Sequence, residues 1–275
     1  MLSGDSPVSD SYNKDSLKNT LLVAIGVCLV CSILVSLSAV ALRPAQQANK
    51  VLDQKQNVLR AAGILPSDAV TDSEGRGIEE LFDSFEARVI DLTTGAYVEG
   101  VDAVAFDPIR AAKEPSTSMA LTKDEDLATL GRRENQSVVY IKRNPDGSID
   151  RLGMPVRGYG LWGTLFGYLA LEGDIQTIAG LGFYSHKETP GLGGEVDNPK
   201  WKAAWPGVVL FDGSGSPAVS LVKSRAPEGS DRARHEVDAL SGATFTTKGV
   251  ENMIRYWMGD GGFGPYLTKL KAGTV

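Results

Sequence analysis

The segment from Asp238 to Thr244 reads D-A-L-S-G-A-T and lies just before an amphipathic stretch. Small hydroxyl residues and glycine at the start of a helix expose backbone N–H groups at the positive end of the helix dipole. Such a helix end favours a phosphate group. The same residues could also serve only as a helix cap, so the spacing alone leaves both interpretations open.

A second polar segment, residues 186–195, reads H-K-E-T-P-G-L-G-G-E and follows a predicted strand. Its proline and glycines fix a sharp backbone path, which gathers the polar side chains in one loop. His186 and Glu188 could act there as a general acid and base. A loop that only connects two elements fits the segment equally well.

A glycine-rich segment, residues 158–163, matches the G-x-G-x-x-G pattern of dinucleotide-binding sites. Its surroundings argue against that site, because Val156 and Arg157 do not make a convincing strand before it and Gly167 weakens a helix after it. A turn that lets backbone approach a flat ligand, with Tyr159 and Trp162 as stacking surfaces, fits better than a dinucleotide site, but the segment alone favours a plain turn with core aromatic residues.

Few side chains are available for metal binding or catalysis. The two cysteines, Cys28 and Cys31, form a C-x-x-C inside an apolar run, and two thiolates fall short of the four that an iron–sulfur cluster usually needs. We interpret them as small apolar residues. His186 and His235 are the only histidines, which argues against a multi-histidine zinc or iron centre. We therefore expect no metal site.

One apolar segment predicts a membrane helix. Residues 21–42 contain no charge, and a helix of that length covers the roughly 30 Å of hydrocarbon in a bilayer. We predict a polar tail over residues 1–20 and one transmembrane helix over 21–42. Residues 39–41 resemble a signal-peptide cleavage site, but the apolar run is longer than in signal peptides.

The charges beside this helix leave its orientation open. The basic residues that flank it are Lys14 and Lys18 before it and Arg43, Lys50, Lys55 and Arg60 after it. Their number favours a cytoplasmic C-terminal side. Long domains, however, cross membranes largely regardless of charge, so this count carries little weight.

The remaining sequence predicts an α+β fold, because its strands and helices do not alternate regularly. We expect a membrane-proximal helix and the first part of the soluble domain, with a variable insertion, over residues 43–136, and the ligand-binding domain over 137–275. Expected helices cover 44–65, 77–85 and 248–258, the last capped by Thr246 or Thr247; expected strands cover 87–92, 137–141, 175–184, 207–211 and 218–223, with a loop or peripheral insertion over 107–136. The turn at residues 144–147 predicts a hairpin.

Composition excludes one class of partner. The chain has 275 residues, of which 42% are hydrophobic and 23% charged, as in globular proteins. Its net charge is −6, so it presents no basic field for a phosphate backbone. We expect no nucleic-acid partner.

These segments resemble one family. Residues 238–244 resemble the flavin-attachment motif D-x-x-S-G-A-T of membrane redox complexes, in which FMN is esterified to the last threonine. Residues 186–197 resemble the H-x-E-T-P-G-L-G-G-E-V-D segment of the NqrC family, which are subunits of the Na⁺-translocating NADH:quinone reductases, and residues 160–172 are similar to that family too. The resemblance covers about residues 137–262 and the N-terminal helix.

The resemblance implies an FMN-binding α+β domain with a mixed or antiparallel sheet and flanking helices on a single membrane helix. It implies a bacterial inner-membrane protein whose C-terminal domain faces the periplasm. The chain would relay electrons from NADH toward quinone within a sodium-exporting pump, while another subunit oxidises NADH. The implied partners are the other membrane subunits of the pump and a flavin transferase.

The resemblance also assigns residues to the flavin. Thr244 would hold the FMN phosphate as a phosphoester, and Asp238 would position the motif. The attachment loop would be shaped by Ser241, Gly242, Ala243 and Phe245; Glu188, Thr189, Leu192 and Gly193 would lie beside the isoalloxazine, with Gly160, Leu161 and Trp162 opposite. The charge of Lys223 would favour a reduced anionic flavin. The resemblance implies that no side chain of this chain is catalytic.

Two other functions stay open at this point. A related FMN subunit of ferredoxin:NAD reductase complexes is one, although the continuous 193–197 segment and the Leu161–Trp162 pair favour the sodium pump. A membrane-anchored FMN sensor or scaffold that carries no electrons is the other.

Overall fold

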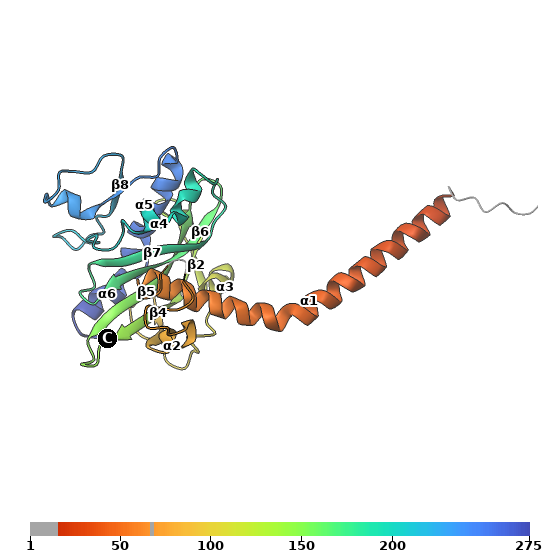
Figure 1. Cartoon of the computed structure of the whole chain (residues 1–275), viewed down its shortest axis with the longest axis horizontal. Helices are drawn as coiled ribbons and strands as arrows, with labels where there is room; N and C mark the ends of the chain where they lie inside the picture. Colours follow the sequence, from red (N-terminus) through yellow and green to blue (C-terminus); the bar gives the residue numbers. More distant parts are fainter. Residues whose placement is uncertain (1–15, 67–68) are drawn as a thin grey trace, which may run out of the picture. The chain divides into compact units, whose positions relative to one another are not determined.

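The computed structural model describes residues 16–66 and 69–275, which form two compact units divided between Val51 and Leu52. Most of the polar tail predicted over residues 1–20, including Lys14, lies outside the described residues. The first element, α1 (Leu17–Ala61), is one continuous helix that runs through Pro44 (Figure 1). The helices expected over 21–42 and 44–65 are therefore parts of the same helix. Its N-terminal part is long and apolar enough to cross a membrane.

The second unit is built on a five-stranded antiparallel sheet in the order β1-β4-β5-β6-β7, of which β4 to β7 are labelled in Figure 1. Its strands are β1 (Phe85–Asp91), β4 (Gln136–Arg143), β5 (Ile149–Tyr159), β6 (Thr164–Glu172) and β7 (Ile178–Ser185). The predicted hairpin is confirmed as β4 and β5, joined through a turn in which Gly147 has a φ of +88°. An α+β fold with an antiparallel sheet is thus confirmed.

The sheet has a hydrophobic core on each face. Alternate residues of a strand point to opposite faces, so Val138 and Tyr140 enter one core while Val139 and Ile141 enter the other. The first core also contains the end of α1 and the short helix α2 (Ile78–Phe82). The second contains apolar residues of α5 (Thr244–Met258) and α6 (Gly264–Lys271). Both sheet faces are therefore covered.

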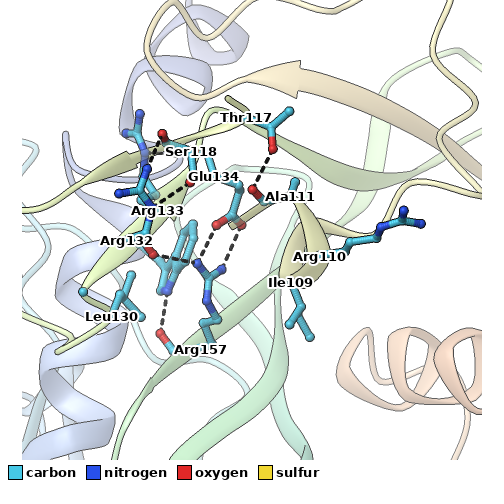
Figure 2. Close-up of polar contacts among 12 residues, drawn as sticks. Ile109, Arg110, Ala111, Thr117, Ser118, Leu130, Arg132, Arg133, Glu134 and Arg157 are labelled. Carbon is cyan, nitrogen blue, oxygen red and sulfur yellow. Dashed lines mark hydrogen bonds and ion pairs between the residues drawn. The ribbon is translucent and has the colours of Figure 1, made fainter. Parts of the chain in front are cut away.

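The insertion expected over residues 107–136 is more ordered than the sequence indicated. It contains α3 (Pro108–Lys113) and a small sheet of β2 (Ser118–Ala120) and β3 (Arg132–Glu134). The Arg157 guanidinium on β5 donates to both carboxylate oxygens of Glu134, over 2.9 and 2.6 Å, and the two side chains face each other in Figure 2. Both residues are buried. A polar composition suggested a peripheral loop, but these charges are paired inside the fold.

Arg157 also joins the insertion to the last long helix. Its guanidinium carbon lies 5.0 Å from the centre of the Trp257 ring in α5. The Trp257 indole N–H donates to the Arg157 carbonyl oxygen over 2.6 Å. The segment that contains Val156 and Arg157, for which no convincing strand was expected, is part of β5 and pairs with β6.

Between β7 and α5 the chain forms only short elements. Its remaining elements are the 3₁₀ turns η1 (Gly193–Asp197) and η2 (Arg232–His235), the helix α4 (Pro199–Lys202), and the parallel strands β8 (Ser220–Val222) and β9 (Glu236–Asp238). The strand expected over 207–211 is wrong, because Val209 bonds to Arg234 and Leu210 bonds to Gln176, which are separate partners that make no continuous ladder.

Candidate functional site

The D-x-x-S-G-A-T segment forms a loop between the end of β9 and the start of α5. Helix α5 begins at Thr244, four residues before the predicted start, so Thr246 and Thr247 lie inside the helix and neither is its cap. Ala243 holds the cap position without a side-chain bond. The Thr247 hydroxyl oxygen instead accepts a hydrogen bond from the Leu240 N–H over 3.1 Å, which folds the loop back onto the first helical turn.

The loop presents Thr244 to solvent. Ser241, Gly242, Thr244 and Phe245 are exposed, whereas Ala243 is buried. Gly242 has a φ of +71°, a conformation that residues with a side chain rarely adopt. Thr244 is the first residue of a 15-residue helix, whose first N–H groups have no partner within the helix. The Thr244 hydroxyl therefore lies where an anion is favoured.

Glu188 joins three segments that are distant in sequence. One carboxylate oxygen accepts the N–H groups of Leu161 and Trp162, over 3.1 and 3.0 Å. The other accepts the Thr246 hydroxyl over 2.5 Å. Glu188 is only 5% exposed. Its carboxylate thus fixes the β5–β6 turn against the first turn of α5.

Two glycines make this contact possible. A Cβ atom on Gly160 would lie 2.6 Å from Glu188 Oε1. A Cβ atom on Gly193 would lie 2.6 Å from Glu188 Oε2 and 2.5 Å from the Thr246 hydroxyl oxygen. Any side chain at either position would displace the carboxylate from its partners.

The glycine-rich segment is a hairpin turn. It follows β5 and leads directly into β6, which pairs antiparallel with β5. A dinucleotide-binding site needs a helix after the glycines, so the arrangement excludes that site for this segment. The preference for a glycine turn is confirmed, although a strand does precede it.

His186 and Glu188 do not face each other as an acid and a base. The His186 Nδ1 accepts the backbone N–H of Glu188 over 3.2 Å. Nε2 lies 2.8 Å from a carboxylate oxygen of Asp197, which also pairs with Lys202 over 3.1 Å. Both ring nitrogens of His186 therefore hold the loop in place.

Exposed apolar side chains surround this region. Trp162 is 63% exposed and Phe245 is 70% exposed, and Tyr159, Leu161 and Leu192 are also exposed. Leu192 lies against the attachment loop, because a Cβ on Gly242 would be 3.0 Å from its Cδ2. Exposed large apolar residues gathered at one place indicate a binding surface.

The remaining predicted site residues, Thr189, Lys223 and Asp238, are all exposed. Thr189 is exposed, and its carbonyl accepts the N–H groups of Leu192 and Gly194 over 3.1 and 2.9 Å. Asp238 is the exposed last residue of β9, and Lys223 is exposed directly after β8. The two strands place them side by side, because Val222 pairs with Asp238.

Glu251, a residue of α5, connects this helix to β8. Its carboxylate accepts the Leu221 N–H over 3.0 Å and pairs with Lys248 over 2.6 Å. Burial raises the pKa of Glu251, but these bonds and the nearby Arg255 charge outweigh it and hold the pKa below the ordinary 4.5. Strand β8 is thereby tied to the helix that carries Thr244.

Sequence reasoning missed two contacting residues. Thr246 was considered only as a cap, whereas its hydroxyl binds Glu188. Trp201 of α4 donates its indole N–H to the Asp238 carbonyl oxygen over 2.9 Å. No residue pattern around Trp201 indicates that contact. Among residues 16–66 and 69–275, no cluster of three or more His, Cys, Asp or Glu residues could hold a metal ion.

Comparisons with known proteins agree on this region. The FMN-binding domain family matches residues 160–259. The NqrC subunit of the Na⁺-translocating NADH-quinone reductase of Pseudomonas aeruginosa is 48% identical over 262 residues, which cover 95% of this chain and 98% of that protein. The same subunit of Vibrio campbellii is 46% identical, again over 95% and 98%.

Two solved structures have the same fold. The crystal structure of Shewanella oneidensis NqrC has a TM-score of 0.73 at 36% identity and covers 82% of this chain and 99% of that one. The corresponding reductase subunit of Parabacteroides distasonis has a TM-score of 0.61 at 30% identity, covering 82% and 97%.

The fold and the matched segment define a membrane-anchored protein with an FMN-binding domain. With relatives of this identity over nearly its full length, the chain belongs to the NqrC family of the Na⁺-translocating NADH-quinone reductases. The resemblance inferred from its motifs is thereby confirmed.

Proposed function

We propose that Thr244 holds FMN through a phosphoester and that the chain carries electrons from NADH toward quinone inside a sodium-exporting pump. The observation that carries this proposal is that Thr244 is exposed and is the first residue of a 15-residue helix. Among the described residues, its hydroxyl has no hydrogen-bond partner that would compete with a phosphate. The relatives are named as subunits of a Na⁺-translocating NADH-quinone reductase, and the proposed pump and its reaction are taken from those names.

The residues around Thr244 fit an FMN phosphate. The N-terminal N–H groups of α5 favour an anion, and Gly242 lets the backbone turn into the helix without a side chain in the way. Ser241, Ala243 and Phe245 complete the loop. Asp238 positions its start through the backbone of β9. A covalent bond at this point keeps the cofactor on the protein outside the cytoplasm.

The residues beyond the loop fit a flat ring. Leu161, Trp162, Thr189 and Leu192 offer exposed surface for it, with Trp162 available for stacking. The Glu188 carboxylate bonds directly to the Leu161 and Trp162 N–H groups, so no ring fits between Glu188 and this turn, and Gly160 and Gly193 leave room for the carboxylate. FMN, when bound, supplies the redox chemistry, and the protein supplies orientation and electrostatics. Lys223 favours a reduced anionic ring through its charge.

The glycine-rich segment 158–163 is a turn between two strands and cannot be a dinucleotide site, and we infer that another subunit oxidises NADH. Its partners are the other membrane subunits of the pump and a flavin transferase that attaches FMN. The single membrane helix lies in a bacterial inner membrane, with the C-terminal domain in the periplasm. Electrons then pass through this chain between subunits.

The intact mass of the full chain, purified from its native membrane, tests the attachment. We expect the added mass of FMN less one water, with peptide mapping that places it on Thr244. Thr244→Val should lose this mass, while the control Ser224→Ala, which removes a hydroxyl from an exposed residue outside the attachment loop, should retain it. An unmodified wild-type chain would refute the attachment. Quinone reductase activity that survives in a flavin-free Thr244→Val complex would favour a scaffold.

A further inference from the structure

The start of the attachment loop is held by a residue outside both motifs. Trp201 lies in α4, and its indole N–H donates to the Asp238 carbonyl oxygen over 2.9 Å. The side chain is buried, and its ring packs edge-on against Trp205 with the ring centres 5.3 Å apart. The hydrogen bond from Trp201 thus connects α4 to Asp238, the first residue of the D-x-x-S-G-A-T segment.

Helix α4 is itself fixed to the loop that contains Glu188. Asn198 caps α4, because its side-chain oxygen accepts the Lys200 N–H over 2.9 Å. The Asn198 amide also donates to the Glu195 carboxylate over 2.7 Å. Trp201 therefore sits at a set distance from the 186–195 segment. The same segment reaches the far end of the attachment loop through Glu188.

The attachment loop is consequently fixed at both ends. At its start, the Asp238 carbonyl accepts Trp201 and the Ala239 N–H donates to Val222 over 2.8 Å. At its end, the Thr246 hydroxyl donates to Glu188. The loop between these points, residues 239–243, is short. Its path, and the direction of the next residue, Thr244, depend on where those ends are held.

We propose that Trp201 is a positioning residue for flavin attachment, acting through the hydrogen bond from its indole N–H to the Asp238 carbonyl. This role rests on the proposed attachment of FMN to Thr244. The bond fixes the loop so that the Thr244 hydroxyl is presented to the flavin transferase. Trp201 itself is not a catalytic residue, because it does not contact the hydroxyl that reacts.

The neighbouring Trp205 provides a matched control. It is fully buried and packs edge-on against Trp201, but its indole N–H has no hydrogen-bond partner among the described residues. Trp205→Phe thus removes the same ring volume as Trp201→Phe without removing a hydrogen bond. A difference between the two variants isolates the bond to Asp238.

A second substitution separates the donor from the packing. Trp201→Phe keeps an aromatic ring but has no N–H. Trp201→His loses more buried apolar surface but can place an N–H at the corresponding ring position. If Trp201 acts only by packing, Phe should be the better replacement. If it acts through the hydrogen bond, His should be the better one.

The experiment follows flavin attachment in the full chain, expressed with its pump subunits and flavin transferase. The flavin-carrying fraction is measured by intact mass at successive times after induction, and the thermal unfolding of each variant is recorded separately. We expect Trp201→Phe to slow attachment about fivefold, because it removes one hydrogen bond of about 1 kcal/mol and that free energy corresponds to about a fivefold change in rate. Trp205→Phe should attach at the wild-type rate, and Trp201→His faster than Trp201→Phe despite a lower unfolding temperature.

Two results would overturn the positioning role. One is equal attachment rates for Trp201→Phe and Trp205→Phe. The other is a ranking of all three variants that simply follows their unfolding temperatures. A wild-type chain without flavin would instead refute the attachment to Thr244, so the two proposals fail in distinguishable ways.

Discussion

Replacing Glu188 should detach the β5–β6 turn from the first turn of α5, because its carboxylate joins them. Glu188→Ala removes the acceptor of three hydrogen bonds, from Leu161, Trp162 and Thr246. At about 1 kcal/mol for each bond, the free energy of unfolding should fall by about 3 kcal/mol. Glu188→Gln keeps an oxygen that can accept the two N–H groups, but its amide NH₂ replaces the oxygen that accepts the Thr246 hydroxyl, so we expect a loss of about 1 kcal/mol.

Urea unfolding of the full chain in detergent, followed by tryptophan fluorescence, measures this change. With a slope of about 2 kcal/mol per molar urea, a loss of about 3 kcal/mol moves the midpoint down by about 1.5 M. Glu99→Ala is the control, because the Glu99 side chain is 84% exposed and lies at 4.0 Å from its one ion-pair partner among the described residues. A Glu188→Ala midpoint within about 0.2 M of the wild type would refute the proposed role of the carboxylate.

Two further predictions concern buried charged residues, namely the Arg157–Glu134 pair and Glu251. Arg157→Met leaves the buried Glu134 carboxylate without its ion-pair partner and should lower the free energy of unfolding by about 3 to 5 kcal/mol, whereas the double variant Arg157→Met/Glu134→Leu should recover most of it in the same urea assay. The pKa of Glu251 is lowered in the folded chain, so the stability it contributes is present above pH 4.5 and is lost as the pH falls through the folded pKa. Glu251→Gln should therefore show a shallower loss of stability with acid below that pH, and an unchanged slope would contradict the prediction.

The main elements of the fold could be predicted because their patterns are local. The β4–β5 hairpin follows from the turn at residues 144–147, and the membrane segment follows from an uncharged apolar run. Strand β5 was harder to recognise because it contains Pro155. The strand pairs with β4 only as far as Gly153, so Pro155 lies where β5 has a partner strand on one side, β6, and its missing N–H is tolerated.

The contacts of the site could not be predicted in the same way. The sequence indicated Glu188 and Thr244 as site residues, but it paired Glu188 with His186, two positions away, whereas its side-chain partners lie 26 to 58 positions away. Arg133 and Glu134 appeared to belong to a solvated insertion, because charged residues are seldom buried unless paired. Their burial depends on partners elsewhere in the chain, which no local pattern reveals.

The two cores have a consequence for how strand β4 finds its partners. In a sheet with one solvent-exposed face, a shift of one strand by one residue exposes its apolar side chains to water, and the free-energy cost of that exposure selects the register. Here Val138 and Tyr140 would merely exchange cores with Val139 and Ile141, so solvation discriminates weakly between the two alignments. Register must be selected instead by the hairpin turn and by side-chain size, so the alignment of β4 with β5 depends on the geometry of residues 144–147.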